Sequence, residues 1–212
     1  MIGALLLAGG TGSRLNSATP KQWLPLGGKP LIRYSYEALA SHPGIGEVIV
    51  VAADGNFPLM AEPGARRQDS VLNGARKARF DTLLIHDAAR PFLTHAVIDR
   101  LLEAGKEADG CVPLLPVADT IKQVTTEGMQ TLPRAELFAA QTPQLVNKEM
   151  LLAGLQQISE VTDDVSVLEQ MGGKVASVKG CELLYKATLP RDLLILELLL
   201  PRYLEAMRHA AV

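Results

Sequence analysis

The chain opens with Ile2-Gly3-Ala4-Leu5-Leu6-Leu7-Ala8, followed at once by Gly9-Gly10-Thr11-Gly12-Ser13-Arg14. An unbroken apolar run of this length predicts a strand buried on both faces, and the glycines predict a tight loop at its carboxyl end. Glycine backbone can approach an anion closely, because no side chain stands in the way. The beginning of the chain therefore favours an α/β fold with an anion-binding loop at the edge of its sheet.

Strand-like and helix-like apolar patterns alternate after this first segment. Strands are predicted at 48–51, 82–86 and 110–117, and helices at 30–40, 69–78 and 95–104. This order predicts an α/β three-layer sandwich with a mainly parallel sheet, in which ligands bind beyond the carboxyl ends of the strands. Further helices are expected near 148–157, 163–171 and 190–209, and strands near 174–178 and 183–186. Residues 1–212 are interpreted as a single domain, since no linker or repeat interrupts them.

Residues 117–134, called the arm below, break the alternation. Asp119, Lys122 and Gln123 place polar side chains in a period-two pattern, and Thr125 to Gly128 offers a turn. We therefore expect a projecting β-hairpin rather than another strand of the main sheet. An isolated hairpin is marginal in water, so the arm needs a partner. A second copy of the arm in a two-fold dimer is the simplest partner, and a lid folded over the chain's own crevice is the alternative.

Composition excludes several classes of protein. Of the 212 residues 48% are hydrophobic and 21% charged, and the net charge is −2. These values exclude a disordered chain and argue against a partner bound through a nucleic-acid backbone. The only cysteines are Cys111 and Cys181, so a disulfide framework is not expected and a reducing cytoplasm is. The apolar runs at residues 1–8 and 193–200 are both shorter than the roughly 20 residues that a bilayer span requires, and no leader is recognised. We expect a soluble cytoplasmic protein without a membrane partner.

Positive charge accompanies the glycine loop. Arg14 lies within it, and Pro20-Lys21-Gln22 follows seven residues later. No Gly-Lys-Ser/Thr completes a Walker loop, and Leu15 stands where a dinucleotide fingerprint has its third glycine. A glycine cradle with two cations instead suits a triphosphate attacked at its α-phosphorus, because fixed cations stabilise the charge that develops there.

Other segments point to one family. The motifs are Gln68-Asp69-Ser70-Val71, His86-Asp87-Ala88-Ala89-Arg90-Pro91, Asp119-Thr120-Ile121-Lys122, Gln141-Thr142-Pro143-Gln144, Thr162-Asp163-Asp164 and Lys186-x-Thr188. Together with the glycine loop, they resemble the 2-C-methyl-D-erythritol 4-phosphate cytidylyltransferases over essentially the whole chain. The resemblance implies a Rossmann-like sandwich of the nucleotide-diphospho-sugar transferase type. It also implies CTP and methylerythritol phosphate as substrates, pyrophosphate release, Mg²⁺ held mainly through the CTP phosphates, and a homodimer with exchanged arms.

The resemblance also assigns roles to individual residues. Catalysis would fall to Arg14, Lys21 and Lys186. The nucleotide would be surrounded by Ala8, Gly9, Gly10, Gly12, Gly64, Arg67, Ser70 and Ala88. The acceptor alcohol would be bound by Asp87, Arg90, Thr120, Arg134, Thr142 and Thr162, with Arg134 reaching the neighbouring subunit's site. No protein ligand for a metal is predicted.

Alternatives remain for several of these residues. Ser70 has a simpler interpretation as a helix cap, as do Asp163 and Asp164, and His86 is interpreted as structural. In the shortened 53–64 loop, Ala65 stands where some relatives carry an acidic residue. The same motifs would also suit a cytidylyltransferase for ribitol or another pentitol phosphate. More distant alternatives are a CMP-sugar synthetase, a hexose-phosphate uridylyltransferase and a non-catalytic nucleotide-binding module.

Overall fold

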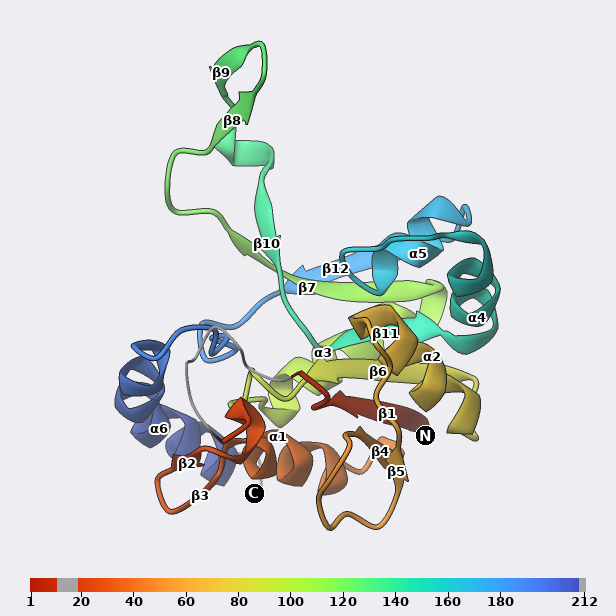
Figure 1. Ribbon diagram of the computed structural model, residues 1–212, viewed down its shortest axis with the longest axis vertical. Coiled ribbons are helices and arrows are strands. Elements are labelled where there is room, and N and C mark those ends of the chain that lie inside the picture. The colour runs from red at the N-terminus through yellow and green to blue at the C-terminus, as the bar shows by residue number, and fades with distance from the viewer. Residues whose placement is uncertain (11–18, 210–212) are drawn as a thin grey trace.

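A mixed, mostly parallel sheet runs through the body of the protein (Figure 1). The computed structural model describes residues 1–10 and 19–209. Within them the main sheet has eight strands in the order β10-β7-β11-β6-β1-β4-β5, with β12 also pairing β7. The bounds are β1 Ile2–Leu7, β4 Ile45–Val51, β5 Met60–Ala61, β6 Thr82–Asp87, β7 Gly110–Pro116, β10 Phe138–Ala140, β11 Gln144–Asn147 and β12 Val175–Lys179.

Helices cover both faces of this sheet. One face packs against α1 (Leu31–Ala40) and α3 (His95–Ala104), and the other against α2 (Arg67–Lys77), α4 (Lys148–Gln157) and α5 (Val165–Gln170). The sides alternate along β1, because successive strand residues point to opposite faces: Leu6 belongs to the first core cluster and Leu5 to the second. A third cluster joins the carboxyl-terminal helix α6 (Asp192–His209) to Tyr34 and Phe92. The three-layer α/β prediction is confirmed.

The central strands β5, β4, β1 and β6 are parallel, as the alternating pattern predicted. β11 is antiparallel to both β6 and β7, and β10 is antiparallel to β7. Neither β10 nor β11 is predicted by the apolar patterns. The strand predicted at 183–186 is wrong, because that segment is a loop. It is nevertheless attached to the body, since the Ala187 amide donates to the Ala89 carbonyl at 2.8 Å.

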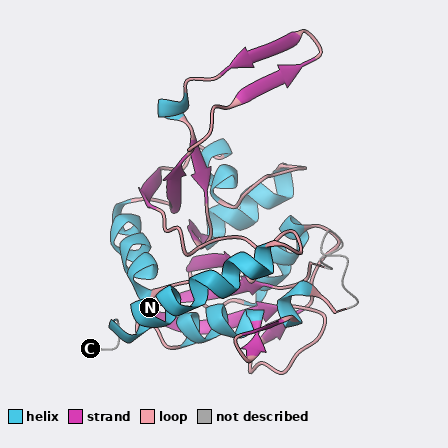
Figure 2. Cartoon of the chain, turned by 90° about the vertical axis from the view of Figure 1, so that its left-hand side faces the viewer, coloured by secondary structure: helices cyan, strands magenta, loops and turns pink. Residues whose placement is uncertain are grey.

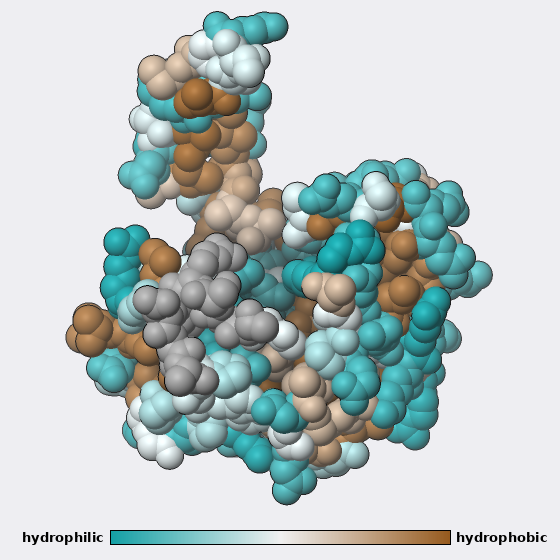
Figure 3. All heavy atoms as spheres, in the orientation of Figure 1, coloured by the Kyte–Doolittle hydropathy of each residue, from teal (hydrophilic) through white to brown (hydrophobic). Residues whose placement is uncertain are grey.

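The arm projects from the end of the sheet between β7 and β10 (Figures 1 and 2). Its strands β8 (Lys122–Thr125) and β9 (Gly128–Thr131) pair only with each other among the described residues, and every residue of both is exposed. Val124 and Met129 are 73% and 68% exposed. Figure 3 shows apolar side chains gathered on the projecting part of the molecule. The hairpin prediction is confirmed, and the arm does not fold over its own body.

Short elements complete the chain. These are the 3₁₀ helices η2 (Lys21–Trp23), η3 (Gly105–Glu107) and η4 (Arg134–Glu136), and the small β2 (Pro25–Leu26) and β3 (Lys29–Pro30) pair. In the part of the chain that the structure describes, no helix has both the length and the apolar character needed to cross a bilayer.

Candidate functional site

A cavity of about 220 Å³ opens at the carboxyl ends of β1 and β6. These strands are parallel neighbours, and their last paired residues are Leu7 and Asp87, so the loops that leave both strands meet at one edge. The described residues that line the cavity are Leu7, Ala8, Gly9, Gly10, Lys21, Gln22, Gly64, Ala65, Arg66, Arg67, Ser70, Asp87, Ala88, Ala89 and Lys186. The site therefore lies where the order of strands and helices predicted it.

Gly9 and Gly10 form one wall of the cavity, and the space beside Gly9 is filled by a neighbouring residue. A Cβ atom at Gly9 would lie 2.4 Å from Pro63 Cβ, so a side chain is excluded there. A Cβ at Gly10 would lie 4.0 Å from Lys21 Cε. The Lys21 side chain thus passes beside the glycine backbone, as an anion cradle requires. Gly12 and Arg14, predicted to belong to the same cradle, lie outside the described residues.

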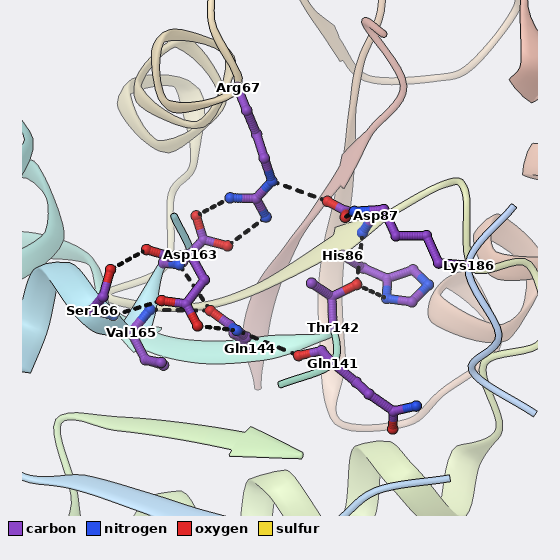
Figure 4. Close-up of polar contacts among 11 residues, drawn as sticks. Arg67, His86, Asp87, Gln141, Thr142, Gln144, Asp163, Val165, Ser166 and Lys186 are labelled. Carbon is purple, nitrogen blue, oxygen red and sulfur yellow. Dashed lines mark hydrogen bonds and ion pairs between the residues drawn. The ribbon is translucent and has the colours of Figure 1, made fainter. Parts of the chain in front are cut away.

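Asp87 lies between two cations. Arg67 Nε donates to Asp87 Oδ1 at 3.1 Å, and Lys186 Nζ donates to Oδ2 at 2.6 Å (Figure 4). Burial opposes ionisation of this carboxyl, but Arg67 and Lys186 outweigh it and hold the pKa of Asp87 well below its usual range. Asp87 is therefore a fixed, ionised acceptor at the cavity wall, joined to one of the predicted catalytic lysines.

Arg67 is itself held by a buried carboxylate. Its Nη1 and Nη2 atoms donate to the two oxygens of Asp164 at 2.8 and 2.7 Å, in a bidentate pair. Gln144 Oε1 accepts from the amides of Asp164 and Val165, at 2.8 and 3.1 Å. Arg67 was predicted to frame the base; it lines the cavity, and its guanidinium donates to Asp164 and Asp87.

The two adjacent aspartates before α5 have different tasks. Asp163 Oδ1 accepts from the Ser166 amide at 3.1 Å, so it caps the helix as predicted. Asp164, which occupies the N-cap position, makes no side-chain cap bond. The capping interpretation is wrong for Asp164, because its side chain turns toward Arg67. Local sequence could not reveal a partner 97 residues away.

A series of hydrogen bonds through Thr142 and His86 holds the backbone of Asp87 in place. The Asp87 amide donates to Thr142 Oγ1 at 3.1 Å, and Thr142 Oγ1 lies 3.3 Å from His86 Nδ1. His86 Nε2 lies 2.9 Å from the Arg90 carbonyl, which fixes the tautomer with its proton on Nε2. Burial lowers the pKa of His86 to about 4. These contacts give His86 the structural role that was predicted for it. Thr142 is only 6% exposed, and its hydroxyl takes part in the same series of hydrogen bonds.

Ser70 lies inside α2 rather than at its start. The helix has Arg66 at its N-cap, and Asp69 Oδ2 accepts from the Arg66 amide at 3.0 Å. The capping alternative for Ser70 is thus wrong. Its hydroxyl accepts from the Gly64 amide at 2.9 Å and fixes the turn at this wall of the cavity. A Cβ at Gly64 would lie 2.2 Å from that of Asp69, so this turn requires glycine.

The remaining predicted residues divide into two groups. Ala88 lines the cavity, and Arg90 behind it donates from Nη1 to the Leu184 carbonyl at 2.6 Å. Thr162 is exposed near the start of α5. Thr120 and Arg134 lie on the arm, and neither lines the cavity of its own chain. Arg134 Nη1 donates to the Ala118 carbonyl at 2.5 Å. Sequence reasoning gave no role to Ala89 or Arg66, which also line the cavity. Ala89 lies within the His86–Pro91 motif, whereas Arg66 lies outside every motif.

No group of three or more His, Cys, Asp or Glu side chains capable of holding a metal occurs among residues 1–10 and 19–209. Asp87 is the one acidic side chain among the described lining residues, and both its oxygens contact cations. Such a wall fits a divalent ion that arrives with phosphate ligands better than one held in a protein cage.

Comparison with known proteins relates nearly the whole chain to a single family. Residues 2–202 match the family model described as IspD, 2-C-methyl-D-erythritol 4-phosphate cytidylyltransferase. The chain belongs to this family. It is 35% identical to the enzyme of that name from Syntrophotalea carbinolica, with 90% of this chain and 92% of the relative covered. The crystal structure of the enzyme of that name from Thermus thermophilus has a TM-score of 0.79 and 30% identity, with 93% of this chain and 98% of that chain covered.

Some members of the family are longer. The chain is 42% identical to a bifunctional IspD/IspF enzyme from Granulibacter bethesdensis, over 91% of this chain but 54% of the relative. It thus spans about half the length of the bifunctional relatives it matches. The family likeness covers all the described walls of the cavity, because the matched range 2–202 includes every one of them.

Proposed function

We propose that this chain transfers CMP from CTP to 2-C-methyl-D-erythritol 4-phosphate, giving the CDP-linked methylerythritol and pyrophosphate. The main observation is a cavity lined by Lys21, Lys186 and the glycines Gly9 and Gly10, in a chain of the IspD family. Relatives named 2-C-methyl-D-erythritol 4-phosphate cytidylyltransferase support the choice of both substrates. Two free cysteines support a cytoplasmic enzyme.

The residues present suit an in-line attack on the α-phosphorus. The acceptor's phosphate is ionised at neutral pH and needs no strong general base. Lys21 and the amides of Gly9 and Gly10 would bind the triphosphate and neutralise the charge that develops in the transition state. Arg14 and Gly12 stay predictions of the sequence for the same role.

Lys186 has two possible anionic partners. In the free protein it donates to Asp87 at 2.6 Å, and its side chain is 39% exposed. An incoming phosphate can therefore recruit Lys186 without deep burial of charge, and Asp87 Oδ2 then becomes available to the hydroxyls of the acceptor. Arg67 still holds Oδ1, so the carboxylate keeps its orientation during the exchange.

Mg²⁺ is part of the proposal. It would be held mainly through the CTP phosphates, with Ala88 and Asp87 at the adjoining wall, and it would neutralise phosphate charge. The single carboxylate among the described lining residues supports this arrangement.

The substrates are tested by incubating the full chain with CTP, Mg²⁺ and either methylerythritol phosphate or ribitol phosphate. Pyrophosphate release is expected with the first alcohol. A clear preference for ribitol phosphate would contradict the proposal and favour the pentitol alternative.

We further propose a homodimer in which each arm completes the partner's acceptor site. Thr120 and Arg134 lie on an arm that projects from the body, and neither lines the cavity of its own chain, which favours a role in a neighbouring copy (Figure 1). Exposed Val124 and Met129 on the arm, with exposed Phe138 on the adjoining β10, offer an apolar surface that a partner can bury. A guanidinium such as Arg134 can bind a phosphate with two hydrogen bonds.

The arm exchange is tested with Lys21→Ala and Arg134→Ala, each expected to lose most of its activity when assayed alone. After subunit exchange, a heterodimer would gather both lesions in one site and leave the other site native, so activity should return. A mixture that stays inactive, although labelled subunits have exchanged, would place Arg134 in its own chain's site.

A further inference from the structure

Lys21 is carried by a very short helix. η2 has a single turn, closed by Trp23 N to Pro20 O at 2.9 Å and Leu24 N to Lys21 O at 3.2 Å. With three residues per turn, its three side chains point in different directions. Lys21 and Gln22 line the cavity, and the buried Gln22 Oε1 accepts no hydrogen bond from any residue that the structure describes. So short a turn has little rigidity of its own, and its third side chain, Trp23, is placed to supply an anchor.

Trp23 is bound to the loop formed by residues 52–59. Its Nε1 donates to Asp54 Oδ1 at 3.0 Å, and its ring stacks on Phe57 with centroids 6.1 Å apart. Gly55 has φ +126°, and a Cβ atom there would lie 2.7 Å from Trp23 Cη2. The loop backbone therefore lies directly against the indole.

The 52–59 loop is in turn held by α1. The Arg33 guanidinium carbon lies 4.6 Å from the centroid of the Phe57 ring, and the Tyr36 ring lies 4.7 Å from it. α1 packs into the first core cluster, so its position is fixed by the body of the protein. A continuous series of contacts thus leads from the core, through Phe57 and Trp23, to the turn that presents Lys21.

We propose that Trp23 is a positioning residue that acts through Lys21, by fixing the η2 turn against the 52–59 loop. The inference rests on the proposed function, because it gives Lys21 a task in the transition state. Small displacements of a charge that binds the transition state lower the rate far more than they lower stability. The Trp23–Asp54 bond is solvent-exposed, so its removal should change turnover without unfolding the chain.

The contact can first be examined in solution. Trp23 is the chain's only tryptophan, so its fluorescence reports on this place alone. Asp54→Ala should shift the emission of the free protein, whereas Asp81→Ala, at another exposed aspartate, should not. Unchanged emission in Asp54→Ala would show that the bond does not form, and would overturn the inference.

Kinetics then separate positioning from mere packing. Trp23→Phe keeps an aromatic ring on Phe57 but loses Nε1–H; we expect kcat to fall about tenfold with KM changed less than about twofold. The matched control Tyr36→Phe removes a hydroxyl from the same aromatic cluster and should have normal turnover. In a Lys21→Ala background, Trp23→Phe should cause no further loss, because its effect passes through the missing ammonium.

Two outcomes would overturn the inference: normal kcat in Trp23→Phe, or an equal loss with and without Lys21. Both require an active native chain. A native chain that releases no pyrophosphate from CTP with any acceptor would refute the proposed function instead, and the two failures are therefore distinguishable.

Discussion

Replacing Asp164 by Asn should destabilise the protein strongly. The Asp164 side chain is only 3% exposed, and both its oxygens accept from Arg67, at 2.8 and 2.7 Å. Asn offers one acceptor and places an NH₂ group against the other guanidinium nitrogen. The substitution therefore removes the charge that balances Arg67 and turns one favourable contact into a repulsive one.

The expected cost follows from the burial of the pair. Removing one partner of a buried ion pair costs about 3–5 kcal/mol, because the other charge is left unbalanced. Arg67 is 34% exposed and keeps its bond to Asp87, so the lower end, about 3 kcal/mol, applies. At about 2–4 °C per kcal/mol for a chain of this size, the melting temperature should fall by about 6–12 °C.

Thermal unfolding of the free protein, followed by circular dichroism, measures the effect. Asp163→Asn is the matched control: it keeps an acceptor for the Ser166 amide and loses only the Gln144 Nε2 bond, so it should cost about 1 kcal/mol. In an Arg67→Met background, Asp164→Leu should be far less harmful than in the native chain, because no buried charge is left unbalanced. Equal melting temperatures for Asp164→Asn and Asp163→Asn would refute this reasoning.

Three further results are expected. Lys21→Ala should lower kcat/KM by roughly 10²–10³ while the melting temperature stays unchanged; early melting with normal turnover would make Lys21 structural. CTP should be preferred over UTP by about 1–3 kcal/mol in kcat/KM. A pocket at Gly64 and Ser70 that hydrogen-bonds the cytosine amino group would leave polar groups unpaired when uracil binds. Equal kcat/KM values for CTP and UTP would show that this wall does not recognise the base. Burial lowers the pKa of His86 from 6.5 to about 4 in the folded protein, so between these pH values the unfolded chain binds one more proton. The free energy of unfolding should therefore drop by about 3 kcal/mol from pH 7 to pH 4, and less steeply in His86→Gln. Identical pH profiles of unfolding for the two proteins would contradict the burial of a neutral imidazole.

Much of the fold follows from local sequence. Continuous apolar runs such as Ile2–Leu7 are buried on both faces, and period alone separates them from helices such as His95–Ala104, whose predicted bounds are those observed. The parallel order of the central strands then brings the ends of β1 and β6 together. The Gly9-Gly10 and Asp87 motifs can therefore be assigned to one crevice from the order of elements alone.

The tertiary structure alone decided how the short segments pair and which charges meet. β10 and β11 have three and four residues, too few to show a period, and their antiparallel pairing depends on strands distant in the chain. The segment 183–186 has an apolar pattern but lies as a loop, and it still delivers Lys186 to Asp87 across 99 residues. The Arg67–Asp164 pair spans 97. Sequence determines local period and turn chemistry, because these depend on neighbours along the chain. Ion pairs between distant segments depend on the packing of the finished core, and only the folded chain specifies them.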